Sequence, residues 1–326
     1  MRLWIIAIAA SVAFGQTHRV FQLRKENKQD PEEIAMLLRG IVETRQVSVD
    51  GVKGTAAVEG TAGQIDMAGW LIQQLDVPAN GPFSGVHEYR PQASGGDDVV
   101  RVFYVRHAAT LEELQDMAAT VRGVADMQRA FVYSPPKAVA LRGAGQKMAL
   151  AAWMFEQLDQ PANIAAPPPH EYKFSADDVT RVFELMHPQD SRQVQEMASL
   201  IQALADTPRL FIYPTRRVLA LRSTAERVAL AAWLVAELDK PAGEQAAAQD
   251  SAKPHEYRPR DDPGNVVRLF YMPISQSAED RRKVALQVRA TTRIRRMHIY
   301  SARGVLAVRG TEGQVAAAEK VTGAMR

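Results

Sequence analysis

The stretch that decides the fold, residues 100–161, reads VRVFYVRHAATLEELQDMAATVRGVADMQRAFVYSPPKAVALRGAGQKMALAAWMFEQLDQP. Its first residues, 100–105, are β-branched and aromatic, which predicts a strand. Apolar residues at three- and four-residue spacing in 111–124 then predict a helix with one buried face. A hairpin is expected over 130–141 and a second helix over about 144–158, which ends before a proline. The stretch therefore predicts a small β-α-β-β-α module.

The same order recurs along the chain. The opening Arg-Val-Phe of this stretch returns as Arg181-Val182-Phe183, and two further copies open at Arg19-Val20-Phe21 and Arg268-Leu269-Phe270. We therefore expect an α+β fold of four tandem β-α-β-β-α modules, each a small mixed sheet with two helices on one face. The expected modules are residues 16–80, 99–163, 179–243 and 265–326. The expected linkers between them are residues 81–98, 164–178 and 244–264.

The N-terminus predicts export. Arg2 precedes an apolar run from Leu3 to Phe14, and small residues at Ala13 and Gly15 fit a signal peptide over residues 1–15, cleaved near Gly15/Gln16. The run is shorter than the roughly 20 residues of a membrane-spanning helix, and an uncleaved anchor is the alternative. The chain has no cysteine, which excludes disulfides, thiolate zinc sites and cysteine nucleophiles. The expected location is periplasmic or secreted, with outer-membrane association only through a partner.

Three short motifs and the module order resemble the periplasmic N-terminal modules of secretins, the ring-forming outer-membrane channels of secretion and type IV pilus systems. The motifs are Arg101-Val102-Phe103-Tyr104-Val105, Ala140-Leu141-Arg142-Gly143 and Leu158-Asp159-Gln160-Pro161. The resemblance covers nearly the whole mature chain as four units and implies ring building or binding to such a machine. It does not include the strand-rich channel domain, so no pore is expected.

His-Glu-Tyr occurs once in each expected linker. A zinc-binding helix needs a second histidine four residues after the first, and none of the three copies has it, so we expect no metal and no cofactor here. The expected role is structural: the tyrosine docks onto a module and fixes the angle to its neighbour. The candidate interface residues are His87, Glu88, Tyr89, His170, Glu171, Tyr172, His255, Glu256 and Tyr257.

The second helix carries two further repeated residues. A tryptophan recurs at Trp70, Trp153 and Trp233. We expect core or inter-module packing for it, with an exposed binding anchor as the alternative; the fourth module has Lys320 instead. An aspartate recurs at Asp76, Asp159 and Asp239. We expect each to bond the turn that follows it rather than to act as a catalytic acid. With no nucleophile motif, phosphate loop or carboxylate pair, an enzyme is not expected.

Charge is concentrated at the C-terminal end. From Arg268 onward there are twelve Lys and Arg against four Asp and Glu, while the whole chain has a net charge of only +3. An acidic ligand (peptide, glycan or nucleic acid) is one reading, and a solvated helix face is the other. The candidate basic patch is Arg281, Arg282, Lys283, Arg289, Arg293, Arg295 and Arg296. Two G-x-x-G loops have KH-type spacing, but they join a strand to a helix, so nucleic acid is disfavoured.

The sequence thus predicts a non-enzymatic exported scaffold for protein–protein interaction or ring assembly in the bacterial envelope, accessory to a secretin-type secretion or type IV pilus system. Its expected partners are envelope proteins or copies of itself. The alternative is a monomeric periplasmic or secreted binding protein that uses the basic fourth module for an acidic ligand.

Overall fold

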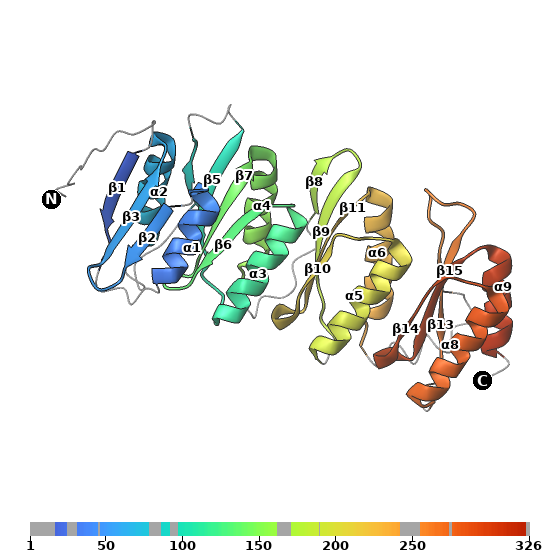
Figure 1. The fold of residues 1–326 in the computed structure, drawn as a ribbon. Coiled ribbons are helices and arrows are strands. Elements are labelled where there is room, and N and C mark those ends of the chain that lie inside the picture. The colour runs from blue at the N-terminus through green and yellow to red at the C-terminus, as the bar shows by residue number, and fades with distance from the viewer. Residues whose placement is uncertain are drawn as a thin grey trace. The chain divides into compact units, whose positions relative to one another are not determined.

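A computed structural model describes residues 17–24, 31–44, 46–77, 86–91, 97–161, 171–188, 190–241, 255–273 and 276–323 (Figure 1). The predicted signal peptide and His170 lie outside the described residues. The chain divides into two compact units, Met1–Asn163 and Ile164–Arg326, and each is considered by itself.

The N-terminal unit holds two modules. The first contains β1 (Thr17–Gln22), α1 (Pro31–Val42), β2 (Gln46–Asp50), β3 (Thr55–Gly60) and α2 (Ala62–Leu75), with the strands in the order β1-β3-β2. The second contains β4 (Val86–Tyr89), β5 (Asp98–Tyr104), α3 (Leu111–Val124), β6 (Arg129–Tyr133), β7 (Ala138–Ala144) and α4 (Gly145–Leu158), in the order β4-β5-β7-β6.

The C-terminal unit repeats this plan. Its first module contains β8 (Glu171–Ser175), β9 (Asp178–Glu184), α5 (Ser191–Ala205), β10 (Leu210–Tyr213), β11 (Val218–Ser223) and α6 (Ala225–Leu238), in the order β10-β11-β9-β8. Its second contains β12 (His255–Tyr257), β13 (Val266–Tyr271), α8 (Ala278–Thr292), β14 (Arg296–Tyr300), β15 (Val305–Gly310) and α9 (Glu312–Gly323), in the order β12-β13-β15-β14. Short 3₁₀ turns at Pro214–Arg216 and Ser301–Arg303 join the hairpins.

The predicted fold class is confirmed, with one difference in the sheets. Every strand pairing among the described residues is antiparallel, where a mixed sheet was predicted. The reason lies in the strand order. In the second module α3 connects β5 to β6, which run in the same direction, but β7 inserts between them and pairs antiparallel with both.

The linkers contain a strand that the sequence did not predict. β4, β8 and β12 lie within the expected linkers, and each pairs antiparallel with the opening strand of the module that follows. Three of the four sheets described therefore have four strands rather than three. The His-Glu-Tyr motifs lie on or beside these added edge strands.

Helices α2 and α9 begin where their capping residues predict. At the start of α2 the Gln64 backbone N–H donates to the Thr61 hydroxyl at 3.4 Å, and the Gln64 side chain accepts from the Thr61 backbone N–H at 2.9 Å. Thr311 and Gln314 repeat this reciprocal arrangement before α9. Each such pair satisfies two backbone donors that the helix itself leaves unpaired. None of the described helices is both long and apolar enough to span a membrane.

Candidate functional site

In both units, neighbouring modules meet through a helix and a sheet. α1 of the first module lies against β6 and β7 of the second, and α5 lies against β14 and β15 in the same way (Figure 1). Since Phe103 stacks on Phe155 of α4 at 4.5 Å, side-chain alternation along β5 turns its neighbour Val102 to the opposite face of the sheet. Each junction therefore fills the sheet face that the module's own helices leave open.

These junctions are apolar at their centre. Val100, Val102 and Tyr133 of the second module belong to the hydrophobic core built around α1 and α2. Val267, Leu269 and Tyr300 join the core of the preceding module in the C-terminal unit. Tyr133 and Tyr300 are each only 1% exposed. Burial of one large side chain contributes roughly 1.5–3 kcal/mol, so a junction with several of them holds two modules firmly together.

An arginine clamps each junction at its edge. Nη1 of Arg142, at the end of β7, donates to the Ile41 carbonyl near the C-terminus of α1 at 2.7 Å, and Nη2 of Arg142 lies 2.7 Å from the Asp98 carboxylate. Arg309, at the end of β15, donates in the same way to the Leu204 carbonyl at 2.8 Å and pairs with Asp262 at 2.8 Å. A cation at a helix C-terminus is favourable because the last carbonyls there lack helical partners.

Sequence reasoning missed this clamp, although a signal was present. The hairpin's second strand ends in Leu-Arg, Leu-Arg and Val-Arg at Arg142, Arg222 and Arg309, while the first module has Glu59 at this place. Arg222 pairs with Asp178 at 2.7 Å. A charge that recurs at the end of an otherwise apolar strand is itself an indication of a buried pairing partner.

A second polar contact recurs at the turn after the edge strand. The backbone N–H and hydroxyl of Ser134 donate to Glu33 of α1 at 2.7 and 2.8 Å. The backbone N–H of Ser301 donates to Glu196 of α5 at 3.1 Å. In both units a carboxylate on the packed helix thus fixes the hairpin turn of the next module.

The His-Glu-Tyr residues lie between modules. Tyr89 packs against Trp70 of α2 with ring centroids 5.5 Å apart, and Tyr257 packs against Trp233 of α6 at 5.6 Å. The Tyr257 hydroxyl also donates to Glu226 at 2.9 Å, and burial together with this carboxylate raises the pKa of Tyr257 to about 12. β4 and β12 thus each join their own sheet to the second helix of the module before it.

His87 and His255 face the same way as the tyrosines of their motifs. His87 meets Tyr104 edge-on at 5.6 Å, and His255 meets Tyr271 at 5.1 Å. Nδ1 of His255 also lies 2.9 Å from Glu237 of α6. Within the described ranges no group of three His, Cys, Asp or Glu side chains could hold a metal ion.

The glutamates of the motif point the other way and pair with the opening strand of their own module. Glu88, Glu171 and Glu256 lie 2.6, 3.1 and 2.7 Å from Arg101, Arg181 and Arg268. The hydrogen bond from Arg268 is the main reason why the pKa of Glu256 lies below its ordinary value. Burial raises the pKa of Glu88, but Arg101 and Arg90 outweigh it and hold that pKa low as well. The motif therefore alternates between neighbour-facing and self-facing side chains, as a strand does.

The recurring aspartates, which were predicted to bond the turn that follows them, accept hydrogen bonds from the loop after their module's own opening strand. Asp76 accepts from the Arg24 backbone N–H at 2.8 Å. Asp159 accepts from the backbone N–H groups of Arg106 and His107, and Asp239 from those of Met186 and His187. This partner lies 52 or 53 residues earlier in the chain, beyond what turn statistics can predict.

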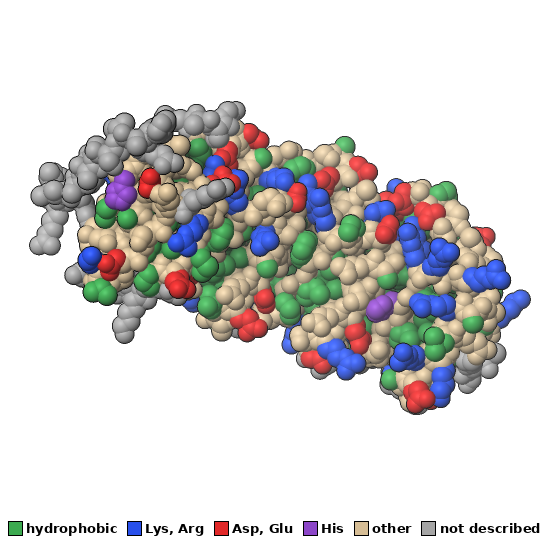
Figure 2. Space-filling model, in the orientation of Figure 1, with side chains coloured by type: hydrophobic (Ala, Val, Ile, Leu, Met, Phe, Trp, Pro, Cys, Tyr) green, Lys and Arg blue, Asp and Glu red, His purple; other side chains and the backbone are tan. Residues whose placement is uncertain are grey.

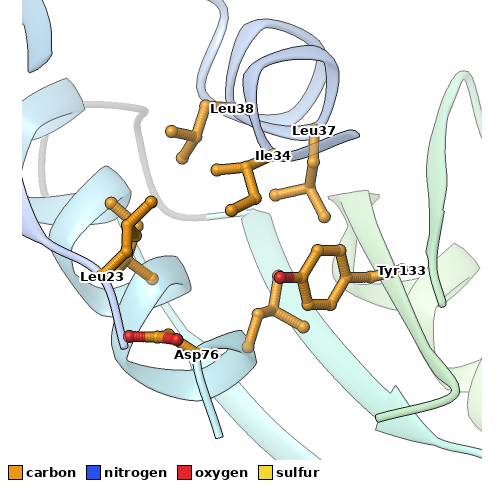
Figure 3. Close-up of a pocket in the computed structure, with 8 residues that line it drawn as sticks. Leu23, Ile34, Leu37, Leu38, Asp76 and Tyr133 are labelled. Atoms are coloured by element: carbon orange, nitrogen blue, oxygen red, sulfur yellow. The ribbon is translucent and has the colours of Figure 1, made fainter. Parts of the chain in front are cut away.

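One gap at the N-terminal junction is too small for a ligand. Figure 3 shows a small gap between the modules, where Tyr133 and Asp76 face Leu23, Ile34 and Leu37. Its volume is about 10 Å³, which accepts one water molecule at most. Burial, reinforced by the charges of Glu33 and Asp76, raises the pKa of Tyr133, so its hydroxyl stays neutral.

The predicted basic patch lies on the fourth module, where Figure 2 shows Lys and Arg side chains gathered. The structure divides it into two groups. Arg281, Arg282 and Lys283 lie in the first turns of α8, where Lys283 pairs with Glu279 at 3.1 Å and Asp280 at 3.5 Å. Arg289, Arg293, Arg295 and Arg296 lie at the end of α8 and the start of β14. At 1.5 Å per helical residue, Arg281 and Arg293 are about 18 Å apart along the helix axis, while Lys283 and Arg289 are about 9 Å apart.

A pocket of about 340 Å³ lies beside the second group. Three of the predicted residues, Arg293, Arg295 and Arg296, line it together with Arg309. Asp262 is the only carboxylate among the lining residues, and Asn265 and Gln314 add neutral polar groups. Arg309 thus serves both the junction and this pocket.

Comparisons with known proteins return the class of protein that the sequence resembles. No family model matches the chain, and no curated protein matches it. A solved N-terminal domain of the secretin XcpQ from Pseudomonas aeruginosa is similar at 17% identity over 47% of this chain and 69% of that one, with a TM-score of 0.19. ExeD of Aeromonas hydrophila is similar at 16% identity over 70% of this chain, with a TM-score of 0.17. The type II secretin GspD of E. coli K12 is similar at 13% identity over 69%, with a TM-score of 0.16.

The resemblance to secretin N-terminal domains is thereby confirmed. The chain spans only 42% of the length of ExeD and 39% of that of GspD. At these identities and TM-scores the likeness lends no weight to any function, which therefore rests on the chain's own residues.

Proposed function

We propose that this protein is a non-enzymatic scaffold of the bacterial envelope, which assembles side by side with copies of itself and serves a secretin-type secretion or type IV pilus system. The observation that carries the proposal is the repeated junction. The same helix, arginine clamp and turn contact lock two modules together in each unit. Because the same packing arrangement occurs in both units, we favour a structural role, in which the protein holds its partners in fixed positions.

The sheets supply surfaces through which copies can associate. Each sheet of this kind has edge strands whose outward backbone N–H and C=O groups lack a partner strand, and such edges pair readily with other chains. β2 is an edge of the first sheet, and β14 is an edge of the fourth. Small modules bury only about 60% of their unfolded surface, which gives them a further reason to pack on neighbours.

The test is the mass in solution of the chain from Gln16, measured by light scattering over a concentration series. A closed oligomer of one defined size is the expected result. A monomer at every concentration would contradict self-assembly. Chemical cross-linking in cells followed by mass spectrometry then asks whether the protein contacts other envelope proteins, and an absence of such contacts would contradict the scaffold role as a whole.

A further inference from the structure

The basic pocket of the fourth module is built from fixed elements. Arg293 ends α8 in a left-handed backbone conformation, with φ at 56°, and its backbone N–H donates to the Arg289 carbonyl at 3.0 Å. Arg295 follows between Ile294 and Met297, which are 2% and 9% exposed and anchor this corner in the core. Two arginines are thus held at the rim of the pocket by buried neighbours rather than carried on a free loop.

The positive charge of the pocket is only partly neutralised. The Asp262 carboxylate is occupied by Arg309 at 2.8 Å and by Asn265 at 2.9 Å, and these bonds hold the pKa of Asp262 below its ordinary value. Arg296 lies 3.4 Å from Asp206 of α5. In the part of the chain that the structure describes, no carboxylate lies within ion-pair distance of Arg293 or Arg295. Two full positive charges therefore face the pocket without a counter-charge.

One buried hydrogen-bond donor beside this charge lacks a partner in the described part of the chain. Arg309 is 8% exposed, and among the described residues its Nε has no hydrogen-bond partner. The N-terminal turn of α9 also borders the pocket through Gln314, and the N-terminus of a helix carries partial positive charge. A guanidinium presents several N–H donors in a planar fork that matches the oxygens of phosphate and carboxylate.

We propose that this pocket binds a phosphate group, either free in solution on a small ester or on a lipid headgroup. A phosphate has two charges and at least three acceptor oxygens, so it can pair with several arginines at once. A single carboxylate, with one charge and two oxygens, would leave some of these arginines without a partner. Arg281, Arg282 and Lys283 lie about 15–18 Å from Arg293 along the α8 axis and outside the pocket lining, whereas Arg289 lies one turn away, so the charge that faces the pocket is concentrated at the end of the helix. The site is independent of the scaffold role, because it requires no second chain.

The test is calorimetric titration of the full chain with inorganic phosphate at constant ionic strength. The probing variant is Arg295→Gln, which removes an unpaired charge from the pocket. The matched control is Arg282→Gln, which removes the same charge from an exposed position on the same module. Circular dichroism of both variants checks that they fold. We expect saturable binding that Arg295→Gln weakens about tenfold, the equivalent of one charged hydrogen bond, while Arg282→Gln leaves it unchanged.

A second arm identifies the source of the phosphate. The three proteins are floated with vesicles of phosphatidylcholine, with and without phosphatidic acid. Flotation that requires phosphatidic acid and is lost only in Arg295→Gln assigns a lipid headgroup, whereas calorimetric binding without flotation assigns a soluble ester. An absence of both kinds of binding, or an equal loss in the two variants, would overturn the proposal, since it would reduce the site to general positive charge.

Discussion

Replacing Gly40 by alanine tests the N-terminal junction directly. Gly40 lies in α1, and a Cβ added there would come within 1.8 Å of the Phe131 ring of β6. Carbon atoms in good contact are about 3.5–4.0 Å apart, so the ring or the helix must move by about 2 Å. Such overpacking costs about 2–3 kcal/mol, and the better helix propensity of alanine returns about 1 kcal/mol. We expect Gly40→Ala to destabilise the junction by about 1–2 kcal/mol.

Two matched changes make this prediction sharp. Gly63→Ala is the control, because a Cβ at Gly63, in the first turn of α2, has no atom within 4 Å; it should stabilise the protein by a few tenths to about 1 kcal/mol. In a Phe131→Ala background, Gly40→Ala should change sign and stabilise as well. Urea unfolding gives the free energies, and hydrogen exchange of peptides from α1 and β6 shows where opening occurs. If Gly40→Ala stabilised the wild-type chain, then α1 would not pack on β6 as described.

Three other changes probe the remaining contacts. Arg142→Ala should cost about 3–5 kcal/mol in urea unfolding, because it leaves the Asp98 carboxylate and a helix carbonyl without their buried partner; a loss below about 1 kcal/mol would contradict the clamp. Tyr257→Phe should lower the free energy of unfolding by about 1.5–3 kcal/mol, because it removes the hydrogen bond to Glu226. Tyr89→Phe is the control and should be nearly neutral, since the Tyr89 hydroxyl has no partner among the described residues. Equal losses of stability in the two variants would contradict the Tyr257–Glu226 bond. Stability should also fall on acidification. The folded-state pKa values of Asp178, Glu256 and Asp262 lie below their ordinary values of 3.8, 4.5 and 3.8, so the unfolded chain takes up protons first. The stabilisation from these groups is present above about pH 4.5 and is lost as the pH falls below it, which urea midpoints over a pH series will show.

The fold could be predicted from the sequence because its signals are local. The opening Arg-Val-Phe, the helical spacing of apolar residues and the Thr-to-Gln caps each concern a few neighbouring positions. The added edge strands could not be predicted in this way, because β12 has only three residues and exists through its pairing with β13. In hindsight, the alternation of His, Glu and Tyr is the strand signal.

The candidate site was predicted less well, and the reason is distance along the chain. Asp159 and Arg106 are 53 residues apart, and Arg142 and Ile41 are 101 apart. The basic patch is the opposite case: its seven residues are close in sequence, yet only Arg293, Arg295 and Arg296 of them line the pocket. Single-sequence patterns identify which residues are repeated, whereas only packing decides which residues meet.

The first sheet and α8, which take no part in the junctions described within the two units, differ from the elements that do. In the first sheet Val20 pairs with Ala57, as Val102 pairs with Ala140 in the second. The neighbouring positions, however, are His18 and Glu59 where the second sheet has Val100 and Arg142. The face of the first sheet therefore lacks the clamp and keeps less of the apolar surface, with Val20 43% exposed on it.

The helix that would enter a following sheet is changed in a corresponding way. α5 buries seven residues, from Val194 to Ala205, whereas α8 buries only Val284, Val288 and Thr292. Its exposed side is charged and cannot fill an apolar sheet face at acceptable desolvation cost. Copies of this chain are therefore not expected to join end to end through a further junction of the same kind. The self-assembly proposed above therefore needs the sheet edges or other surfaces of the modules.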